Sequence, residues 1–391
     1  MRADLTLLIV ARNAAATIER AMLSCVTEPG CPIVLVDDFS RDDTVARARS
    51  IAGSRLHMLT SPLPGGVGLA RQCALDAVET EYAAWLDADD EWIAGRSARL
   101  VRMLEDGADI ATESIDLYDG ETSQWQRRLT VPSFVRCRGG ALRLFERNFL
   151  PGDTQVAFRT HVFRDAGGYD PAIRGPESFD LLLRAIQRGA RLAAGDEVGY
   201  RMYAYPGSLS RNLDRQRAAL MLALRKHQYA DVRRMYLDAG YDPRVASWAL
   251  VMLAQFRGES GQALAFLDDA SPRGINDAEV LEPDGPWPFA EGWRRAFHRG
   301  TLLLQEGEAR LAAEELRRAE DLNPTAEGAN NLGVALARLG PQRDARAAFD
   351  LAAARFPGYV DARLNGEAEL PSAITTHPLR RIASRSEYHA A

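Results

Sequence analysis

The sequence predicts an α/β domain with a Rossmann-like, mostly parallel sheet, followed by an all-α domain. Three observations support this prediction. Short apolar runs typical of strands alternate with helix-like patterns over residues 1–105, and several of these runs end in polar or acidic clusters. Strand signals stop after residue 212. Helical patterns then continue, and one of them recurs with its first glycine at Gly300 and again at Gly333.

The composition is that of a folded globular protein. A chain of 391 residues, 46% hydrophobic and 26% charged, is long enough for two or more domains with sizeable cores. The net charge of −6 argues against a general basic surface for nucleic acid. The first apolar run, 5–10, is too short for a secretion signal, and no run approaches the ~18 residues of a membrane span. We therefore expect a cytoplasmic protein with no membrane span and no nucleic-acid partner.

Four strands and three connecting helices are expected in the first half of the α/β domain. Each strand is a short apolar run with β-branched residues, and Asn13 is placed to cap the first helix. A β-α-β alternation of this kind gives parallel strands joined by right-handed crossovers. The expected strands are 5–10, 33–36, 57–59 and 82–86, and the expected helices begin near residues 14, 42 and 69.

Polar clusters follow three of these strands, at residues 12–13, 37–38 and 87–89. Because the carboxyl ends of parallel strands share one edge of the sheet, this edge is a ligand site by geometry. Asp87 and Asp89 have the Asp-x-Asp spacing that lets two carboxylates share one hard cation, and Mg²⁺ in proteins typically binds one or two carboxylates plus substrate phosphates. The alternative is a loop of solvated acidic residues.

A glycine-rich loop at 65–68 precedes the third helix and allows the backbone to approach a phosphate closely. The first strand lacks the Gly-x-Gly-x-x-Gly turn of dinucleotide-binding proteins. The chain also lacks a Gly-Lys-Ser/Thr loop, which argues against a P-loop kinase or NTPase.

Four stretches in this order resemble the nucleotide-sugar half of family 2 glycosyltransferases, with their GT-A fold: 8–13, 36–44, 65–72 and 86–92. The resemblance implies that Asp38 accepts a hydrogen bond from the base of a nucleotide and that Asp87 contacts the ribose or a metal. It implies that Asp89 holds Mg²⁺ or Mn²⁺ on the diphosphate, so the expected metal residues are Asp87 and Asp89. The expected nucleotide-sugar residues are Ala11, Asn13, Asp38, Arg71 and Asp87. Alternatives are that Asp37 and Asp42 cap helices and that Arg71 is a surface arginine.

The acceptor half departs from the family pattern at the expected catalytic base. After a turn at 167–170 that resembles the family's Gly-Gly-aromatic-Asp turn, the family usually has Glu-Asp-x-Asp-Leu, and its first Asp is the base. This chain has Glu177 followed by Ser178, with Asp180 in the place of the second Asp. Three explanations remain open: Glu177 acts as the catalytic base, the acceptor needs little base, or transfer activity is lost. An acceptor thiol would fit the second, because its pKa is near ~8.5.

A second departure concerns the metal. Many relatives have a histidine near the closing strand that can join the metal shell, and this chain has Tyr203 and Tyr205 there. A third protein ligand to the metal is therefore not expected from these positions. Ser208 and Ser210 follow and either touch the diphosphate or form a plain turn.

The C-terminal half resembles tetratricopeptide repeats, with units at 291–324 and 326–357. Such arrays bind peptides or other subunits in a groove, although the helices could equally form a stiffening cap or a dimer contact. Asn330 and Asn331 on the first helix of the last unit could hydrogen-bond an extended backbone. The recurring residues are Gly300, Gly307, Ala312, Leu316, Ala319 and Pro324, repeated as Gly333, Gly340, Ala345, Phe349, Ala352 and Pro357.

We therefore predict a GT-A domain at 1–212, divided into a nucleotide-sugar half (1–105) and an acceptor half (106–212), a tetratricopeptide-like domain at 213–366 and a loose tail at 367–391. The predicted function is metal-dependent, inverting sugar transfer from a nucleotide sugar, for which UDP is the commonest choice in the family. The arrangement is similar to bacterial peptide glycosyltransferases that modify Ser or Cys. The acceptor could equally be a glycan or a small metabolite, and the repeats could bind a protein partner or a second copy. The alternative function is a non-catalytic scaffold that binds nucleotide sugars.

Overall fold

The computed structural model describes residues 4–28, 30–64, 66–205, 213–270, 291–340 and 342–376. The chain divides into two compact units, 1–226 and 227–391, each described here by itself. Helix α7 (Leu213–Leu224) falls in the first unit. The domain boundaries expected from the sequence stay predictions. Gly65, Ser208, Ser210 and residues 377–391 lie outside the described residues.

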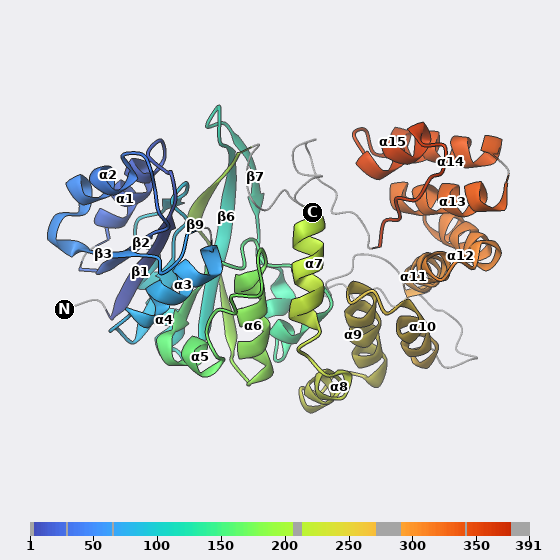
Figure 1. The fold of residues 1–391 in the computed structure, drawn as a ribbon. Coiled ribbons are helices and arrows are strands. Elements are labelled where there is room, and N and C mark those ends of the chain that lie inside the picture. The colour runs from blue at the N-terminus through green and yellow to red at the C-terminus, as the bar shows by residue number, and fades with distance from the viewer. Residues whose placement is uncertain are drawn as a thin grey trace. The chain divides into compact units, whose positions relative to one another are not determined.

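Within the described residues, the first unit is built on one nine-stranded mixed sheet in the order β3-β2-β1-β4-β8-β6-β9-β5, with β7 paired to β6 (Figure 1). The strands are β1 (Leu5–Ala11), β2 (Ile33–Asp37), β3 (Leu56–Thr60), β4 (Tyr82–Trp85), β5 (Glu91–Trp92), β6 (Ile110–Asp119), β7 (Trp125–Leu129), β8 (Ala157–Arg159) and β9 (Leu192–Ala204).

The first four strands form a parallel half-sheet, as the sequence predicts. β1 lies between β2 and β4, with Leu7 in register with both Ile33 and Ala84. Both faces of β1, β2 and β4 are buried, which explains their nearly continuous apolar sequence, whereas β3 at the edge of the sheet is partly exposed. One face packs on α1 (Ile18–Val26), α2 (Thr44–Ala52) and α4 (Arg96–Glu105). Helix α3 (Val67–Asp76) contacts β1 and β2 as well, and connects β3 to β4.

The second half of the sheet makes it mixed rather than mostly parallel. β8 runs antiparallel to both β4 and β6, whereas β9 runs parallel to β6 and antiparallel to β5. The expectation of an α/β domain is confirmed, and the expectation of a mostly parallel sheet holds only for its first half. The remaining helices of this unit are α5 (Thr160–Asp165) and α6 (Glu177–Gln187), with short 3₁₀ segments at Gly53–Arg55, Ser133–Arg136 and Gly140–Phe145.

Two local predictions are wrong. Asn13 does not cap α1, which begins only at Ile18; Asn13 has φ 49° and its side-chain oxygen accepts the Arg41 N–H at 2.8 Å. The side chain is thereby used to join two loops and is not available to a helix end. The helical pattern over 213–237 predicts one long helix, but the structure divides it into α7 and α8 (Tyr229–Asp238), on either side of Lys226.

The second unit is helical, as expected. Two helix pairs stand at the predicted repeats: α11 (Glu291–Gln305) with α12 (Ala309–Leu322), and α13 (Ala326–Leu339) with α14 (Gln342–Arg355). A Cβ on Gly300 would lie 2.7 Å from the Leu316 side chain, and a Cβ on Gly333 would lie 2.5 Å from the Phe349 ring. Glycine is therefore required at equivalent places in both pairs. The other helices are α9 (Pro243–Phe256), α10 (Ser260–Asp269) and α15 (Val360–Glu367).

The loose tail expected from residue 367 is wrong for its first part. Glu367 ends α15, and residues 372–376 are held by hydrogen bonds from Gln255, Asn330, Asn331 and Asn365. In the part of the chain that the structure covers, we find no helix with the length and apolar character needed to cross a bilayer.

Candidate active site

The ends of β1, β2 and β4 meet at one edge of the sheet, as the sequence predicts. The N–H of Asp38 donates to the Ala11 carbonyl at 2.8 Å, which fixes the turn after β2 against the last residue of β1. Asp87 follows β4 by two residues, and its neighbour Leu86 donates its N–H to the Leu8 carbonyl at 2.9 Å. The predicted donor residues of these three strands therefore lie in adjacent loops.

Asp38 is buried at this edge, with 4% of its surface exposed. Its Oδ2 accepts a hydrogen bond from Nη1 of Arg12 at 3.3 Å. Asp42 in the same loop accepts from the N–H groups of Thr44 and Ala15, both at 3.1 Å. The hydroxyl of Thr44 also donates to Asp42 and lowers the pKa of this carboxyl. Asp42 thus joins the loop before α1 to the start of α2, although the N-cap residue of α2 is Asp43, whose side chain makes no cap hydrogen bond.

Arg71 is the centre of a buried charged network and not a surface arginine, so that alternative is wrong. Its guanidinium lies 2.8 Å from Glu177 Oε1 and 3.2 Å from Asp87 Oδ1, and its side chain is 9% exposed. Burial alone would lower the pKa of Arg71, but the carboxylates of Glu177 and Asp87 outweigh burial and raise it. The same guanidinium donates to Ser178 Oγ at 2.5 Å. Arg71 therefore connects the donor edge to the start of α6.

Asp87 and Asp89 form a pair of carboxylates with different surroundings. Asp87 accepts from Arg71 through Oδ1 and from Gln155 Nε2 through Oδ2, at 3.2 and 2.5 Å. For Asp89, burial and then the charge of Asp87 raise the pKa to about 6. A backbone hydrogen bond and the charge of Arg20 lower the pKa of Asp89, but by less than burial raises it. Two close carboxylates, one of them largely desolvated, fit a divalent cation, which would relieve their repulsion.

The described residues place no third carboxylate, histidine or cysteine with Asp87 and Asp89 in an arrangement that could hold a metal. Across the described ranges there is no cluster of three or more His, Cys, Asp or Glu side chains arranged to hold a metal. Tyr203, where relatives have a histidine, donates its hydroxyl to Glu91 at 2.8 Å and stacks on Tyr118 at 5.3 Å between ring centroids. A cation here would complete its coordination with substrate phosphates and water, as Mg²⁺ commonly does.

Residues of β9 hold the loop from Asp87 to Asp90 in place. Asp90 is 3% exposed and accepts from the Tyr200 hydroxyl at 2.9 Å and from the Tyr203 N–H at 2.8 Å. The Tyr200 hydroxyl in turn accepts the N–H of Asp87 at 3.0 Å. Burial and then the charge of Asp89 raise the pKa of Asp90 well above its usual range. These contacts fix the loop that carries Asp87 and Asp89 without engaging the carboxylate of either residue.

Arg20 is a residue of this site that the sequence did not indicate. Its guanidinium lies 3.6 Å above the Tyr203 ring, 3.2 Å from the Tyr205 hydroxyl, and donates to the Asp89 carbonyl. Arg20 therefore places a positive charge against the backbone of the loop that carries Asp87 and Asp89. No motif surrounds Arg20 in α1, and its partner Tyr205 is 185 residues away in sequence, so no local signal could have found it.

Two further carboxyls lie on the acceptor side. Glu177 begins α6 and is 2% exposed; its Oε1 accepts from Arg71 and its Oε2 accepts from the Gly175 N–H at 3.0 Å. Asp153 is partly exposed, and burial together with the charge of Glu177 raises its pKa to about 6. Asp153 was not among the site residues that the sequence indicated. Its burial beside Glu177 is visible only in the folded chain.

The turn at 167–170 lies against α3, which explains its glycines. The N–H of Tyr169 donates to Gln72 Oε1 at 2.6 Å. Gly168 has φ 64°, and a Cβ there would lie 2.3 Å from the same oxygen. Only glycine fits, both for its left-handed backbone and for the lack of space.

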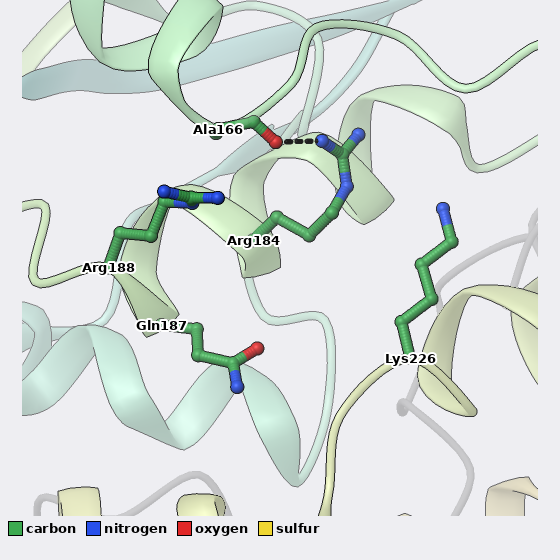
Figure 2. A pocket seen from close by; sticks show the side chains of 5 residues that line it. All are labelled: Ala166, Arg184, Gln187, Arg188 and Lys226. Carbon is green, nitrogen blue, oxygen red and sulfur yellow. Dashed lines mark hydrogen bonds between the residues drawn. The ribbon is translucent and has the colours of Figure 1, made fainter.

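A hollow of about 360 Å³ lies elsewhere on this unit (Figure 2). Arg188 stands eleven residues beyond Glu177, about 16 Å along the helix axis, so the hollow is separate from the carboxylates above. Two of its cations are already paired, since Arg184 and Lys226 each lie 2.7 Å from Asp180. We therefore regard it as a structural feature of α6. It is lined by Ala166, Arg184, Gln187, Arg188 and Lys226.

Comparison with known proteins identifies the family. The family model described as Glycosyl transferase family 2 matches residues 6–167. The succinoglycan biosynthesis protein ExoO of Rhizobium meliloti (strain 1021) is 31% identical over 260 residues, which cover 60% of this chain and 70% of ExoO. The chain belongs to glycosyltransferase family 2. This glycosyltransferase is also 31% identical over 249 residues to the succinoglycan biosynthesis protein ExoU of the same strain, which cover 60% of the chain and 67% of ExoU.

Solved structures include Staphylococcus aureus TarS, which aligns with this glycosyltransferase at a TM-score of 0.47 and 14% identity. The alignment covers 88% of this chain and 54% of the TarS chain, so the glycosyltransferase spans about half the length of that structure. The expected fold class, a GT-A domain followed by a helical region, is confirmed.

The structure of the glycosyltransferase brings most of the predicted site residues together. Arg71, Asp87 and Glu177 share one network, and Asp89 adjoins it. Asp38 and Ala11 meet in the neighbouring loop. The chemical role of each residue stays a prediction.

Proposed function

We propose that this glycosyltransferase moves a sugar from a nucleotide sugar, in the first instance a UDP-sugar, to an acceptor nucleophile with inversion at the anomeric carbon. The observation that carries the proposal is the pair Asp87 and Asp89 at the carboxyl edge of β4, in which burial and the charge of Asp87 raise the pKa of Asp89 to about 6. We propose that this pair holds Mg²⁺ or Mn²⁺. When bound, the cation would stabilise negative charge on the departing diphosphate.

The donor would lie across the ends of β1, β2 and β4. Asp38 is buried at the end of β2, where a carboxylate can accept an N–H from the base of the nucleotide. Ala11 and Asn13 would border the nucleotide through the loop that follows β1. Arg71 orients Asp87 and neutralises Glu177, so we assign it a positioning role beside the donor rather than direct contact with the base.

The reaction needs a group that accepts the acceptor's proton as its oxygen or sulfur attacks the anomeric carbon. In that step the new glycosidic bond forms, the bond from the anomeric carbon to the diphosphate oxygen breaks, and the nucleoside diphosphate leaves. Glu177 is the sequence prediction for this base, but both of its oxygens already accept hydrogen bonds. Asp153 is more exposed and its pKa is raised to about 6, near the range in which a general base works best. We infer that Asp153 is the better candidate.

Substitution separates these two carboxyls. If Asp153 is the base, Asp153→Asn lowers kcat by about 10²–10⁴-fold. The pH profile of wild-type kcat/KM then rises through about pH 6, because the base acts in its ionised form. Glu177→Gln would instead weaken the Arg71 network and chiefly change stability and KM. A normal rate in Asp153→Asn together with a lost rate in Glu177→Gln would return the role to Glu177.

The acceptor is proposed in two classes. ExoO and ExoU are named for the biosynthesis of succinoglycan, which favours a glycan acceptor. The helical unit favours a peptide acceptor with Ser or Cys, as the similarity to peptide glycosyltransferases implies. We also propose that α11–α14 are tetratricopeptide-like pairs. Their matching glycine contacts, Gly300 with Leu316 and Gly333 with Phe349, support this.

The test of function is nucleotide release from a panel of UDP-, GDP- and dTDP-sugars with Mn²⁺, measured with and without EDTA. We expect slow hydrolysis of one donor and its loss on chelation. Release that continues unchanged in EDTA would overturn the metal proposal. Absence of release and of calorimetric binding for every donor would overturn the donor proposal.

A further inference from the structure

Strands β6 and β7 form a hairpin that lies beside β9 (Figure 1). β8 runs antiparallel to both β4 and β6, so β4 and β6 run in the same direction. Ala84 of β4 and Ala111 of β6 are both in register with Ala157 of β8. From this level β6 continues with β9 parallel to it. The ends of β6 and β9 therefore lie at the sheet edge that carries Asp87 and Asp89.

Three aromatic side chains cross this end of the sheet on one face. Tyr118 of β6 is in register with Trp125 of β7 on one side and with Tyr203 of β9 on the other, and register partners share a face. The rings of Tyr118 and Tyr203 stack at 5.3 Å between centroids. Trp125 is 56% exposed, whereas Tyr203 is 8% exposed. We call Trp125, Tyr118 and Tyr203 the aromatic row.

The buried end of the aromatic row contacts the donor edge. Arg20 lies 3.6 Å above the Tyr203 ring and donates to the Asp89 carbonyl. The N–H of Tyr203 donates to Asp90 at 2.8 Å. Because neighbouring strands lie about 4.8 Å apart, the backbone of Trp125 is about 10 Å from that of Tyr203. The exposed ring therefore stands outside the donor edge by more than the length of one pyranose ring.

The turn of the hairpin is an ordered one. The Asp119 carboxylate accepts the N–H groups of Glu121 and Thr122 at 3.0 and 2.8 Å. A Cβ on Gly120 would lie 2.6 Å from the Tyr205 ring, so glycine allows this ring to pack on the turn. The turn is thus held both by its own side chain and by the residue that follows β9. Trp125 is presented on a fixed element, which favours binding.

Two ion pairs flank the aromatic row on the same face. Asp116 accepts from Nε and Nη2 of Arg128 at 2.8 and 3.2 Å, and Arg201 lies 3.3 Å from Glu91. The arginine side chains are 53% and 45% exposed. The Arg201 guanidinium also lies 5.9 Å from the centre of the Tyr118 ring. Since each cation has a carboxylate partner, these pairs offer hydrogen-bond donors and acceptors without net charge.

An exposed aromatic ring among paired ions suits a neutral sugar. The face of an aromatic ring is electron-rich and attracts the weakly positive C–H groups on the apolar face of a pyranose. The hydroxyl groups around the sugar need both donors and acceptors, which arginine and carboxylate side chains supply. A single exposed apolar side chain needs no functional explanation. Here the tryptophan, the ion pairs and the donor edge occur together on one part of the sheet.

We propose that the aromatic row and its two ion pairs bind a neutral sugar of a glycan acceptor, with that sugar stacked on Trp125. The sugar held there is not the one that attacks the donor, because Trp125 stands about 10 Å from Tyr203. The inference rests on the proposed transfer reaction and selects, from its two acceptor classes, a glycan of at least two sugar units. Trp125 takes no part in the chemical step.

The first test measures binding without a donor, so that it does not depend on turnover. The probes are four neutral tetrasaccharides: cellotetraose, laminaritetraose, mannotetraose and chitotetraose. Among the described tryptophans, Trp125 is exposed and the other four are buried: Trp85, Trp92, Trp248 and Trp293. We therefore expect at least one tetrasaccharide to move the tryptophan emission of wild type to shorter wavelength. No shift with any of the four would overturn the proposal.

Substitutions locate the binding site. Calorimetry should show that Trp125→Ala weakens binding of the same tetrasaccharide about tenfold or more, as truncation of a central aromatic contact does. Trp125→Phe keeps a ring face and should retain most of the affinity. Leu237→Ala, at a 42% exposed residue of α8, is the control and should bind as wild type does. Wild-type affinity in Trp125→Ala would overturn the proposal.

A transfer assay tests the position of the bound sugar. With the tetrasaccharide as acceptor, Trp125→Ala should raise KM about tenfold and change kcat by less than about twofold, because only binding outside the reacting atoms is lost. With the methyl glycoside of one sugar unit as acceptor, KM should not change, because this acceptor does not reach Trp125. An equal rise in KM for both acceptors would place the attacked sugar on Trp125 and overturn the proposed position.

Nucleotide release from wild type without an acceptor tests the transfer reaction separately. Tetrasaccharide binding without release from any donor would support the sugar site and count against the transfer proposal. Release from a donor without tetrasaccharide binding would overturn this inference alone. An emission shift produced by phosphatidylglycerol vesicles, but by none of the tetrasaccharides, would assign Trp125 to a membrane surface and would also overturn it.

Discussion

The donor edge of the first unit and a cluster of carboxamides in the second unit, Gln255, Asn330, Asn331 and Asn365, satisfy their polar groups in different ways. The donor edge collects carboxylates after β2 and β4, and burial together with the charge of Asp87 raises the pKa of one of them, Asp89, to about 6. The carboxamide cluster consists of neutral side chains that donate hydrogen bonds to backbone carbonyls of residues 373–376. The donor edge is destabilised by repulsion between its own carboxylates, which a bound cation would relieve. The carboxamide cluster is already hydrogen-bonded to a segment of the same chain.

This difference shows how each unit accommodates its buried polar and charged groups. A charged site can remain open because water and neighbouring arginines screen it, and its ligand brings the opposite charge. The four carboxamides are buried in the structure that includes residues 372–376, and their hydrogen bonds to that segment offset the cost of burying them. The following predictions test this contrast.

Arg71→Met should produce the largest loss of stability. It leaves Glu177 and Asp87 without the cation that balances them inside the protein, which costs about 3–5 kcal/mol for a buried pair. Arg47→Met is the matched control, since Arg47 pairs with Glu19 at the surface, with side chains 43% and 52% exposed, and such pairs contribute about 1 kcal/mol or less. Urea unfolding of both variants measures the difference. Equal losses would show that the network around Arg71 is not a buried one in solution.

Asp89→Asn should remove donor turnover while sparing the fold. It deletes one of two protein ligands at the proposed metal site, so we expect a fall of about 100-fold or more in metal-dependent nucleotide release. Asp106→Asn, at an exposed residue after α4, is the control. Because burial disfavours the Asp89 charge, the asparagine should not lower the free energy of unfolding without metal. Full activity in Asp89→Asn would exclude this residue as a ligand.

The donor edge could be predicted because it depends on a local rule. Acidic residues directly after apolar strands must reach the same edge of a parallel sheet, so Asp38, Asp87 and Asp89 were recognisable one strand at a time. Arg71 was recognisable as part of a motif, but its burial was not. Its partner Glu177 is 106 residues away in sequence, and no helix pattern around Arg71 reveals that contact.

The helical unit shows the same limit of prediction from sequence, since periodic features were predicted and non-periodic ones were not. Glycines at 300 and 333 predicted helix pairs because close packing needs a small residue in a periodic pattern. The segment 371–376 has no periodicity, since it is held by side chains from other helices, and it was expected to be loose. Asn330 and Asn331 were expected to be able to bind an extended backbone, and the structure shows that the chain itself provides it. What the sequence did not indicate in the second half of the sheet is strand direction, since β8 runs antiparallel to both β4 and β6.

The pH dependence of Mn²⁺ binding tests whether Asp89 is a metal ligand. Asp89 is protonated in the metal-free folded chain up to about pH 6, and a metal binds only the ionised carboxylate. Calorimetric Mn²⁺ affinity should therefore be flat above pH 6 and fall about tenfold per unit below it. Asp89→Asn should abolish the dependence. An affinity that stays flat down to pH 5 would show that Asp89 is not a metal ligand.

The same shift fixes the sign of the stability change without metal. The folded pKa of Asp89 is raised from 3.8 to about 6, so between these values the folded chain holds a proton that the unfolded chain has released. The contribution of Asp89 to the free energy of unfolding is therefore greatest below about pH 4 and decreases as the pH rises to 6. Saturating Mn²⁺ should remove this decrease, because the metal-bound chain keeps Asp89 ionised as the unfolded chain does.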